Sequence, residues 1–174
     1  MYQFVIPIHH VNWSTRSVLE GIHQKYKPKH IYVITSENEI KILKNKSKNW
    51  KIKNLTLLDE DIFFLKKYGL TKADIVSQIT QNKPNYTPGW LYQQIIKLGA
   101  DDVINDIEEA FVVWDSDLLP VKSWPLVDKK KEKFALLQDK SHGNQDVLNS
   151  WKNLITNVLK INPVQDVRGT FTSH

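Results

Sequence analysis

Ala110-Phe-Val-Val-Trp-Asp115-Ser-Asp117-Leu-Leu-Pro120 is the stretch of sequence that decides the fold. The apolar run before Asp115 predicts a fully buried strand of a parallel sheet, and Pro120 prevents the strand from continuing. Because residues i and i+2 of an extended segment point to the same side, Asp115 and Asp117 are expected to converge on a hard cation such as Mg²⁺ or Mn²⁺. The competing interpretation is an Asp-rich turn that caps the strand.

A second Asp-x-Asp occurs at Asp59-Glu60-Asp61. About one such tripeptide is expected by chance at this Asp content, so the spacing alone is weak evidence. Position separates the two copies, because ligands of parallel sheets bind beyond the carboxyl ends of the strands. The copy at Asp115 follows the stronger strand signal and is therefore the predicted ligand site.

Strand-like and helix-like segments alternate along the chain. This alternation predicts an α/β fold with a mixed, mostly parallel sheet flanked by helices, in a single domain over residues 1–174. A Ser17-x-x-Glu20 capping box is expected to start the first helix. Strands are predicted over 3–8, 30–35, 54–58, 110–114 and 133–138, and helices over 14–26, 37–46, 72–81, 89–99 and 145–159.

The composition narrows the class of partner. The net charge is +5, yet only Arg16 and Arg168 are arginine, so the bidentate groups that nucleic-acid recognition favours are scarce and no nucleic-acid partner is expected. The lysine-rich stretch from Lys41 to Lys53 predicts a solvated surface, with peripheral contact to an acidic membrane as the functional alternative. The absence of cysteine, of a signal peptide and of a transmembrane stretch favours a cytoplasmic protein.

Four segments, in this order, resemble the nucleotide-sugar-dependent glycosyltransferases of the GT-A fold, in particular small families from bacteria and large DNA viruses: Phe4–His10, Tyr86–Gly99, Phe111–Pro120 and Asn144–Asn149. The resemblance implies a GT-A-like, Rossmann-like domain that moves a sugar from a donor, with UDP-sugar favoured, to a hydroxyl of a glycan or other acceptor. It implies Mn²⁺ or Mg²⁺ as cofactor. Since the sequence stops abruptly at Phe171-Thr-Ser-His174, a truncated acceptor side or further domains of a larger enzyme are also expected.

The same resemblance assigns roles at the cation and at the sugar. Asp117 would bind the metal directly, Asp115 would bind it through water or touch the ribose, and His174 would be a late metal ligand, while Ser116 lies between the two carboxylates. Asp146 is the candidate catalytic base, needed if the sugar configuration inverts. An N-terminal helix cap is the alternative role for Asp146.

Further residues are expected to contact the nucleotide. On the helix 89–99, Gln94 and Lys97 share a polar side with Gln93, and Lys97 is the candidate phosphate ligand; the other side is expected to be apolar, with Trp90, Leu91, Ile95 and Leu98. A solvated lysine is the alternative. The remaining candidates lie at strand ends, where turns, caps and packed histidines are the alternatives: Pro7, Ile8 and His9 for the nucleoside, Thr35 and Ser36 for base or ribose, and Asp59 or Asp61 for the imino proton of uracil.

Two other functions fit parts of the pattern. A non-catalytic domain that binds a nucleotide or an anionic surface through its lysines needs no acidic pair. A phosphatase of the haloacid dehalogenase class also carries strand-Asp-x-Asp, but on its first strand and followed by a small turn, whereas here three predicted strands precede the motif and Leu118-Leu119-Pro120 follows it.

Overall fold

The computed structural model describes residues 2–82, 87–123, 126–128 and 133–134. The chain divides into two compact units, Met1–Ser123 and Trp124–His174. In the second unit, β5 (Val127–Asp128) pairs antiparallel with β6 (Lys133–Phe134). The predicted strand 133–138 is therefore seen at its start, while the predicted helix 145–159 lies outside the described residues.

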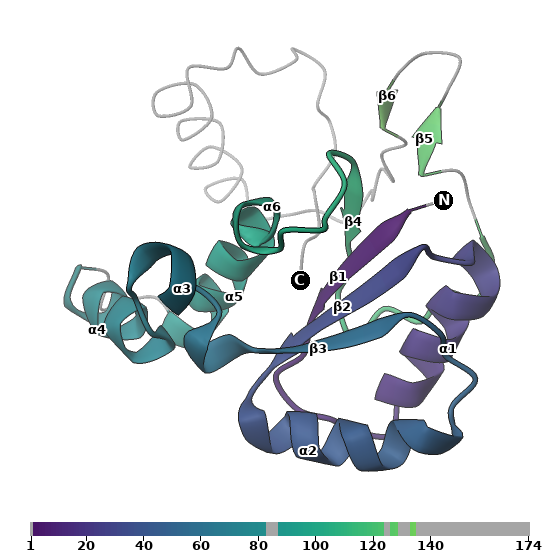
Figure 1. The fold of residues 1–174 in the computed structure, drawn as a ribbon, viewed down its shortest axis with the longest axis horizontal. Helices are drawn as coiled ribbons and strands as arrows, with labels where there is room; N and C mark the ends of the chain where they lie inside the picture. Colours follow the sequence, from purple (N-terminus) through teal and green to yellow (C-terminus); the bar gives the residue numbers. More distant parts are fainter. Residues whose placement is uncertain (1, 83–86, 124–125, 129–132, 135–174) are drawn as a thin grey trace, which may run out of the picture. The chain divides into compact units, whose positions relative to one another are not determined.

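The first unit is an α/β layer structure (Figure 1). Its four strands are all parallel, in the order β3-β2-β1-β4, so the α/β prediction is confirmed, whereas the sheet is parallel throughout rather than mixed. The elements in chain order are β1 (Gln3–Pro7), α1 (Thr15–Tyr26), β2 (His30–Thr35), α2 (Glu37–Lys46), η1 (Ser47–Asn49), β3 (Leu55–Asp59), η2 (Glu60–Ile62), α3 (Leu65–Tyr68), α4 (Lys72–Asn82), α5 (Pro88–Leu98), α6 (Ala100–Val103) and β4 (Phe111–Val113).

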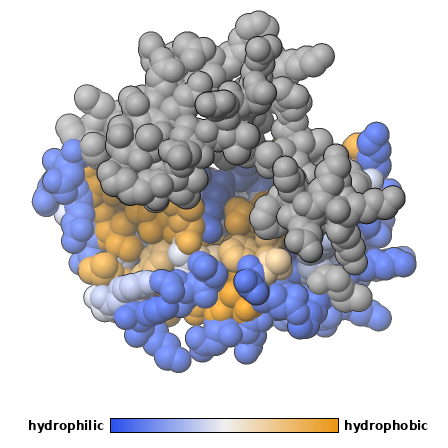
Figure 2. All heavy atoms as spheres, turned by 90° about the horizontal axis from the view of Figure 1, so that it is seen from above, coloured by the Kyte–Doolittle hydropathy of each residue, from blue (hydrophilic) through white to orange (hydrophobic). Residues whose placement is uncertain are grey.

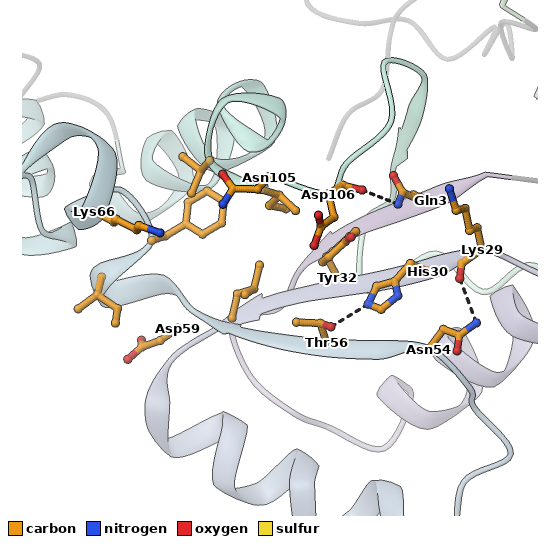
Figure 3. A pocket seen from close by; sticks show the side chains of 15 residues that line it. Gln3, Lys29, His30, Tyr32, Asn54, Thr56, Asp59, Lys66, Asn105 and Asp106 are labelled. Carbon is orange, nitrogen blue, oxygen red and sulfur yellow. Dashed lines mark hydrogen bonds between the residues drawn. The ribbon is translucent and has the colours of Figure 1, made fainter.

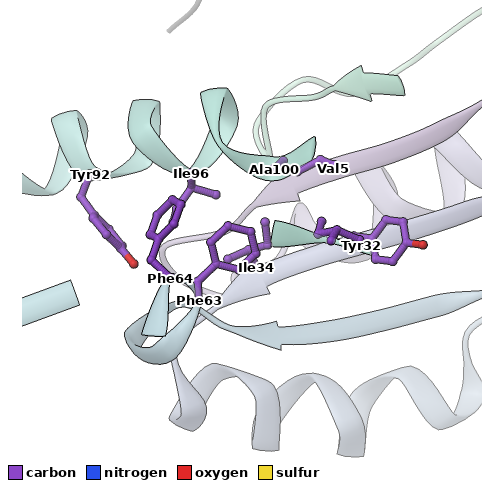
Figure 4. Close-up of a cluster of buried hydrophobic side chains, with 9 residues drawn as sticks. Val5, Tyr32, Ile34, Phe63, Phe64, Tyr92, Ile96 and Ala100 are labelled. Atoms are coloured by element: carbon purple, nitrogen blue, oxygen red, sulfur yellow. The ribbon is translucent and has the colours of Figure 1, made fainter. Parts of the chain in front are cut away.

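Helices cover the two central strands on both faces, which explains their continuous apolar sequences. Phe4 and Val5 of β1 point to opposite faces and both are fully buried. The nonpolar cluster on the α5 and α6 side contains Val5 and Ile34 of the sheet together with Tyr92 and Ile96 of α5 (Figure 4). Burial on both faces thus fixes β1 and β2 as the centre of the unit.

β4 differs from its predicted form. It has three residues instead of five, pairs only with β1 among the described strands, and leaves Val113 39% exposed, so the expectation of a fully buried strand over 110–114 is wrong. Trp114 extends the pairing by one hydrogen bond from its backbone N–H to the Val5 carbonyl, at 2.9 Å. Its buried indole packs against Phe4 and Tyr26.

The first helix begins earlier than the predicted capping box. Asn12 Oδ1 accepts hydrogen bonds from the backbone N–H groups of Ser14 (2.9 Å) and Thr15 (3.2 Å), and α1 starts at Thr15. Glu20 pairs with Arg16 instead of capping the helix. The Ser17 capping box is therefore wrong, because the turn made by Asn12 starts the helix upstream of it.

Strand order creates a switch point in this sheet. Relative to β1, strands β2 and β3 lie on one side and β4 on the other. Helices α1 and α2, which connect the first three strands, lie on one face, and α5 and α6, which precede β4, lie on the opposite face (Figure 1). In open parallel sheets of this kind, ligands bind at the carboxyl ends of the strands where the order reverses, which here is between β1 and β4. None of the helices in the described residues is long and apolar enough to span a membrane.

Candidate functional site

The residues after β1 and β4 lie side by side at the switch point. Val5 is the register partner of Val113, so the same register continued by two residues sets Pro7 opposite Asp115. From the sequence, Pro7 and Asp115 were each predicted to lie at the end of a separate strand. The parallel pairing of β1 with β4 brings them to one edge of the sheet.

Asp115 forms an ion pair with Lys97 of α5. Lys97 Nζ lies 2.5 Å from Asp115 Oδ1, and the two side chains are only 9% and 12% exposed. Both residues were predicted to face the nucleotide, but their contact with each other was not. A buried carboxylate of this kind has its charge compensated within the protein.

The segment after Asp115 is a turn rather than an extended chain. Leu118 N–H donates to the Asp115 carbonyl at 3.2 Å, and the Trp114 indole N–H donates to the Leu118 carbonyl at 2.8 Å. The expectation that Asp115 and Asp117 point to one side as i and i+2 of an extended segment is therefore wrong. Asp117 is exposed, Ser116 is half-buried, and Asp115 turns inward to its lysine.

Pro120 fixes the far end of this turn on α1. A Cβ atom added to Gly21 would lie 3.0 Å from Pro120 Cγ and 3.2 Å from Pro120 Cδ. Pro120 itself is buried. The missing side chain of Gly21 thus makes room for the segment that follows Asp117.

A pocket of about 400 Å³ lies beside the switch point. Its walls come from the end of β1, from η2, from the start of α4 and from the first two turns of α5. The lining residues predicted from sequence are Pro7, Ile8 and His9; those missed are Glu60, Lys72, Val76, Thr87, Gly89, Trp90, Tyr92 and Gln93.

A second buried ion pair forms part of this pocket. Lys72 Nζ lies 2.5 Å from Glu60 Oε1, with side-chain exposures of 27% and 10%. The Tyr92 hydroxyl donates to the Glu60 carbonyl at 2.5 Å, and Lys72 Nζ lies 5.7 Å from the centre of the Tyr92 ring. Burial, and then the negative charge of Glu60, raise the pKa of Tyr92. The acidic tripeptide that flags Glu60 was the only sequence signal for this pair.

Helix α5 connects the pocket to Asp115. Trp90 and Gln93 line the pocket, and Lys97 lies one turn further along the same side. The prediction that Gln93 and Lys97 share one side of this helix is therefore correct. The predicted apolar side is not, because α5 buries Tyr92 and Ile96 and leaves Leu98 82% exposed.

One face of the molecule, seen from above, carries a group of hydrophobic residues with hydrophilic residues beside it (Figure 2). Gln94 is half-buried, and its Nε2 atom has no hydrogen-bond partner within the described part of the chain. Gln94 therefore lies on α5 as expected, while its predicted nucleotide contact stays a prediction.

Three other predicted residues have local structural roles. Thr35 is fully buried, so its side chain does not face solvent. Ser36 caps α2 by accepting from the Glu39 N–H. Asp59 caps η2 by accepting from the Asp61 N–H at 3.0 Å. These are the turn and cap roles given as alternatives, and the nucleotide roles remain untested predictions.

The loop after β1 is tied to α2. Glu39 accepts from the Val11 N–H at 2.9 Å and lies 3.3 Å from His10 Nδ1. The hydrogen bond from Val11 is the main cause of a lowered pKa of Glu39. His9 is exposed and its ring lies 4.0 Å from that of His10, so the loop presents His9 at the rim of the pocket.

The described residues hold no cluster of three His, Asp or Glu side chains able to bind a metal. The predicted metal ligand His174 and the predicted base Asp146 lie outside these residues. The predicted donors within the described residues are Asp117, which is exposed, and Asp115, which is paired with Lys97. A Mg²⁺ ion bound with substrate phosphates commonly uses one or two carboxylates and keeps several waters, so this donor set fits such an ion.

A larger cavity of about 930 Å³ extends along β3 and over the starts of β1 and β2 (Figure 3). Its polar groups largely satisfy one another: His30 Nε2 lies 2.7 Å from Thr56 Oγ1, and Gln3 donates to the Asp106 carbonyl at 2.9 Å. Burial lowers the pKa of His30, which favours its neutral form. Asp59 lines this cavity and not the smaller pocket. Of the described residues, none that directly follows β1 or β4 lines this larger cavity, so the cavity lies away from the switch point and is the weaker candidate for a ligand site.

The fold and this edge of the sheet define an α/β protein with a doubly wound parallel sheet and a charged site at its switch point. The chain belongs to the family of unknown function DUF6492, whose profile matches residues 17–170. No curated protein and no solved structure matches the chain.

Proposed function

We propose that this chain is a metal-dependent, GT-A-like glycosyltransferase that takes a sugar from a nucleotide-sugar donor. The observation that carries the proposal is the position of the Asp115–Asp117 turn, beyond β4 and beside Pro7 at the switch point of a parallel sheet. This is where doubly wound sheets bind nucleotides. The order of motifs that resembles the GT-A transferases supports the same function.

The 400 Å³ pocket is the proposed site of the nucleoside. Trp90 is 37% exposed and offers a ring on which a base can stack. The Glu60 carboxylate can only accept hydrogen bonds and the Lys72 ammonium can only donate them. Uracil presents an N–H beside a carbonyl and matches this pair, whereas the corresponding nitrogen of cytosine carries no hydrogen. Guanine presents the same N–H beside a carbonyl, so the pair favours uracil or guanine over cytosine, and the choice of a UDP-sugar rests on the resemblance.

The phosphates would extend along α5 from the pocket to Lys97. Lys97 lies seven positions after Trp90, which is about 10 Å along a helix, a span suited to a nucleoside diphosphate. Asp117, with Asp115, would hold the Mn²⁺ or Mg²⁺ ion. When bound, the ion supplies charge neutralisation on the departing diphosphate. The roles of Asp146 and of an acceptor hydroxyl rest on the resemblance.

A non-catalytic nucleotide-binding domain is the second candidate. The specific observation in its favour is the Lys97–Asp115 ion pair, because it leaves Asp117 as the one exposed carboxylate of the motif. Such a domain would bind a nucleoside diphosphate through Lys97 and release no product. Turnover separates the two functions.

The experiment is an assay of UDP release from a panel of UDP-sugars in Mn²⁺, with and without acceptor glycans. The proposal expects release by the wild-type chain and a loss on the order of 100-fold in Asp117→Asn. Asp101→Asn, which changes an exposed acid of α6 outside the pocket and the motif, is the matched control and should retain activity. Nucleotide binding without release of UDP from any donor would favour the binding domain instead.

A further inference from the structure

We infer that Lys97 is an exchangeable counter-ion of the site: it neutralises Asp115 in the free protein and passes to the diphosphate when ligand binds, so that diphosphate and cation bind cooperatively. The inference rests on the proposed function and concerns the regulation of the same site. The Lys97–Asp115 contact thus weakens cation binding in the absence of the nucleotide.

The geometry shows where the exchange would occur. Lys97 Nζ contacts Asp115 Oδ1 at 2.5 Å, and both side chains are about nine-tenths buried, so solvent screens their interaction little. On the same side of α5, Gln93 faces the 400 Å³ pocket. Lys97 lies one turn beyond Gln93, so a phosphate that extends along α5 from a base in this pocket would lie next to the Lys97–Asp115 pair.

Charge makes the two partners of Asp115 mutually exclusive. A divalent cation near Asp115 is repelled by the ammonium group that already neutralises the carboxylate. A diphosphate supplies negative charge that can take over the ammonium, which frees Asp115 for a cation. Each ligand thus removes the obstacle to the other, and thermodynamic linkage requires that the enhancement be equal in both directions.

The two carboxylates of the motif differ in whether a cation can reach them in the free protein. Asp117 lies at the surface of the turn and has no cationic partner in the described residues. Asp117 is thus available to a cation at all times, while Asp115 is available only after Lys97 has left. The free protein should bind Mn²⁺ weakly through Asp117 alone.

The first test measures free Mn²⁺ by electron paramagnetic resonance in titrations of the full chain without nucleotide. Lys97→Met should bind Mn²⁺ at least about tenfold more tightly than the wild type, since the repelling charge is gone. Lys66→Met, which removes an exposed lysine, should match the wild type. The double variant Lys97→Met with Asp115→Asn should lose the gain. Equal Mn²⁺ affinities of Lys97→Met and wild type would overturn the inference.

The second test does not depend on folding of the Lys97 variant. Asp115→Asn releases the ammonium group from its partner, so UDP should bind this variant more tightly than wild type in the absence of metal, by about tenfold in calorimetry. In the wild type, Mn²⁺ should instead be required for tight UDP binding. Unchanged or weaker metal-free UDP affinity of Asp115→Asn contradicts the exchange.

The outcomes separate this inference from the proposed function. A wild-type chain that binds no UDP in Mn²⁺ removes the proposed function, even if Lys97→Met gains affinity for Mn²⁺. A wild-type chain that binds and turns over UDP-sugars, with no change of Mn²⁺ affinity in Lys97→Met, keeps the function and removes the counter-ion exchange.

Discussion

The two Asp-x-Asp tripeptides have the same spacing, but a different acid of each is buried in an ion pair. In Asp59-Glu60-Asp61 the outer acids are tied by a cap, and the central Glu60 is buried against Lys72. In Asp115-Ser116-Asp117 the first acid is buried against Lys97, and the last is exposed. The difference teaches that each tripeptide acquires its role from the strand that it follows: β3 leads into η2 and the pocket, whereas β4 ends at the switch point.

The largest expected difference between the two copies is in catalysis. Asp117→Asn removes the exposed carboxylate at the switch point and should lower UDP release on the order of 100-fold. Asp61→Asn leaves the switch point unchanged and alters only an exposed acid 3.9 Å from Lys72, so it should lower the rate far less than Asp117→Asn. Steady-state rates with the best UDP-sugar measure both variants. Equal losses would show that the tripeptides do not differ in function.

The two buried ion pairs should differ in their contribution to stability. Lys97→Met leaves the carboxylate of Asp115 buried without its partner and should lower the free energy of unfolding by about 3–5 kcal/mol. Lys72 is more exposed, at 27%, so Lys72→Met should cost less. Urea unfolding at neutral pH measures both.

The control for these two variants is Lys29→Met, which breaks an ion pair whose side chains are 55% and 42% exposed. Because solvent screens such pairs, this change should cost less than about 1 kcal/mol. A loss for Lys97→Met as small as that of Lys29→Met would contradict the burial of the Asp115 pair.

Alkaline pH should destabilise the first unit through Tyr92, whose hydroxyl bonds to Glu60 in the first Asp-x-Asp. The folded state raises the pKa of Tyr92, so neutral Tyr92 contributes stability that is complete below the unfolded value of about 10 and is lost as pH rises above it. Tyr92→Phe loses the hydrogen bond to Glu60, which is worth about 1 kcal/mol at pH 7. Above pH 10 the gap between the variants should narrow. Parallel unfolding curves from pH 7 to 11 would show that Tyr92 does not titrate with unfolding.

The smallest expected effect concerns Gly21, which lies against Pro120 at the end of the second Asp-x-Asp turn. Gly→Ala inside a helix ordinarily stabilises by about 1 kcal/mol, but at Gly21 the added Cβ meets Pro120 at 3.0 Å. Gly21→Ala should therefore show no gain in thermal stability and weaker Mn²⁺-dependent UDP binding. Gly89→Ala, where nothing lies within 4 Å of the added atom, is the control for helix propensity. A stability gain in Gly21→Ala equal to that control would mean that Pro120 yields freely.

Local sequence signals predicted the secondary structure well where they were strong. The strand His30–Thr35 and the helix Glu37–Lys46 have their predicted bounds, because a continuous apolar run is followed directly by the Ser36 cap. The predictions failed where a side chain bonds to the backbone. The indole of Trp114 closes the turn at Leu118, four residues on, and strand propensity does not report this contact.

The candidate site was predictable in part for the same reason. Strand ends identified Pro7 and Asp115, since parallel pairing brings such residues to one edge. The Glu60–Lys72 pair joins residues twelve positions apart on different elements, and the inward turn of Tyr92 replaces the expected apolar side of α5. Both depend on how α4 and α5 pack beyond β3, which periodicity does not encode.

The most direct test of the central claim is calorimetric titration of the full wild-type chain with UDP, in Mn²⁺ and in EDTA, beside Asp117→Asn. A nucleotide site at the switch point between β1 and β4 predicts UDP affinity at least about tenfold higher in Mn²⁺ than in EDTA, with this enhancement absent from Asp117→Asn. Wild-type chain that binds no nucleoside diphosphate in Mn²⁺, or Asp117→Asn that keeps the full enhancement, would contradict the claim.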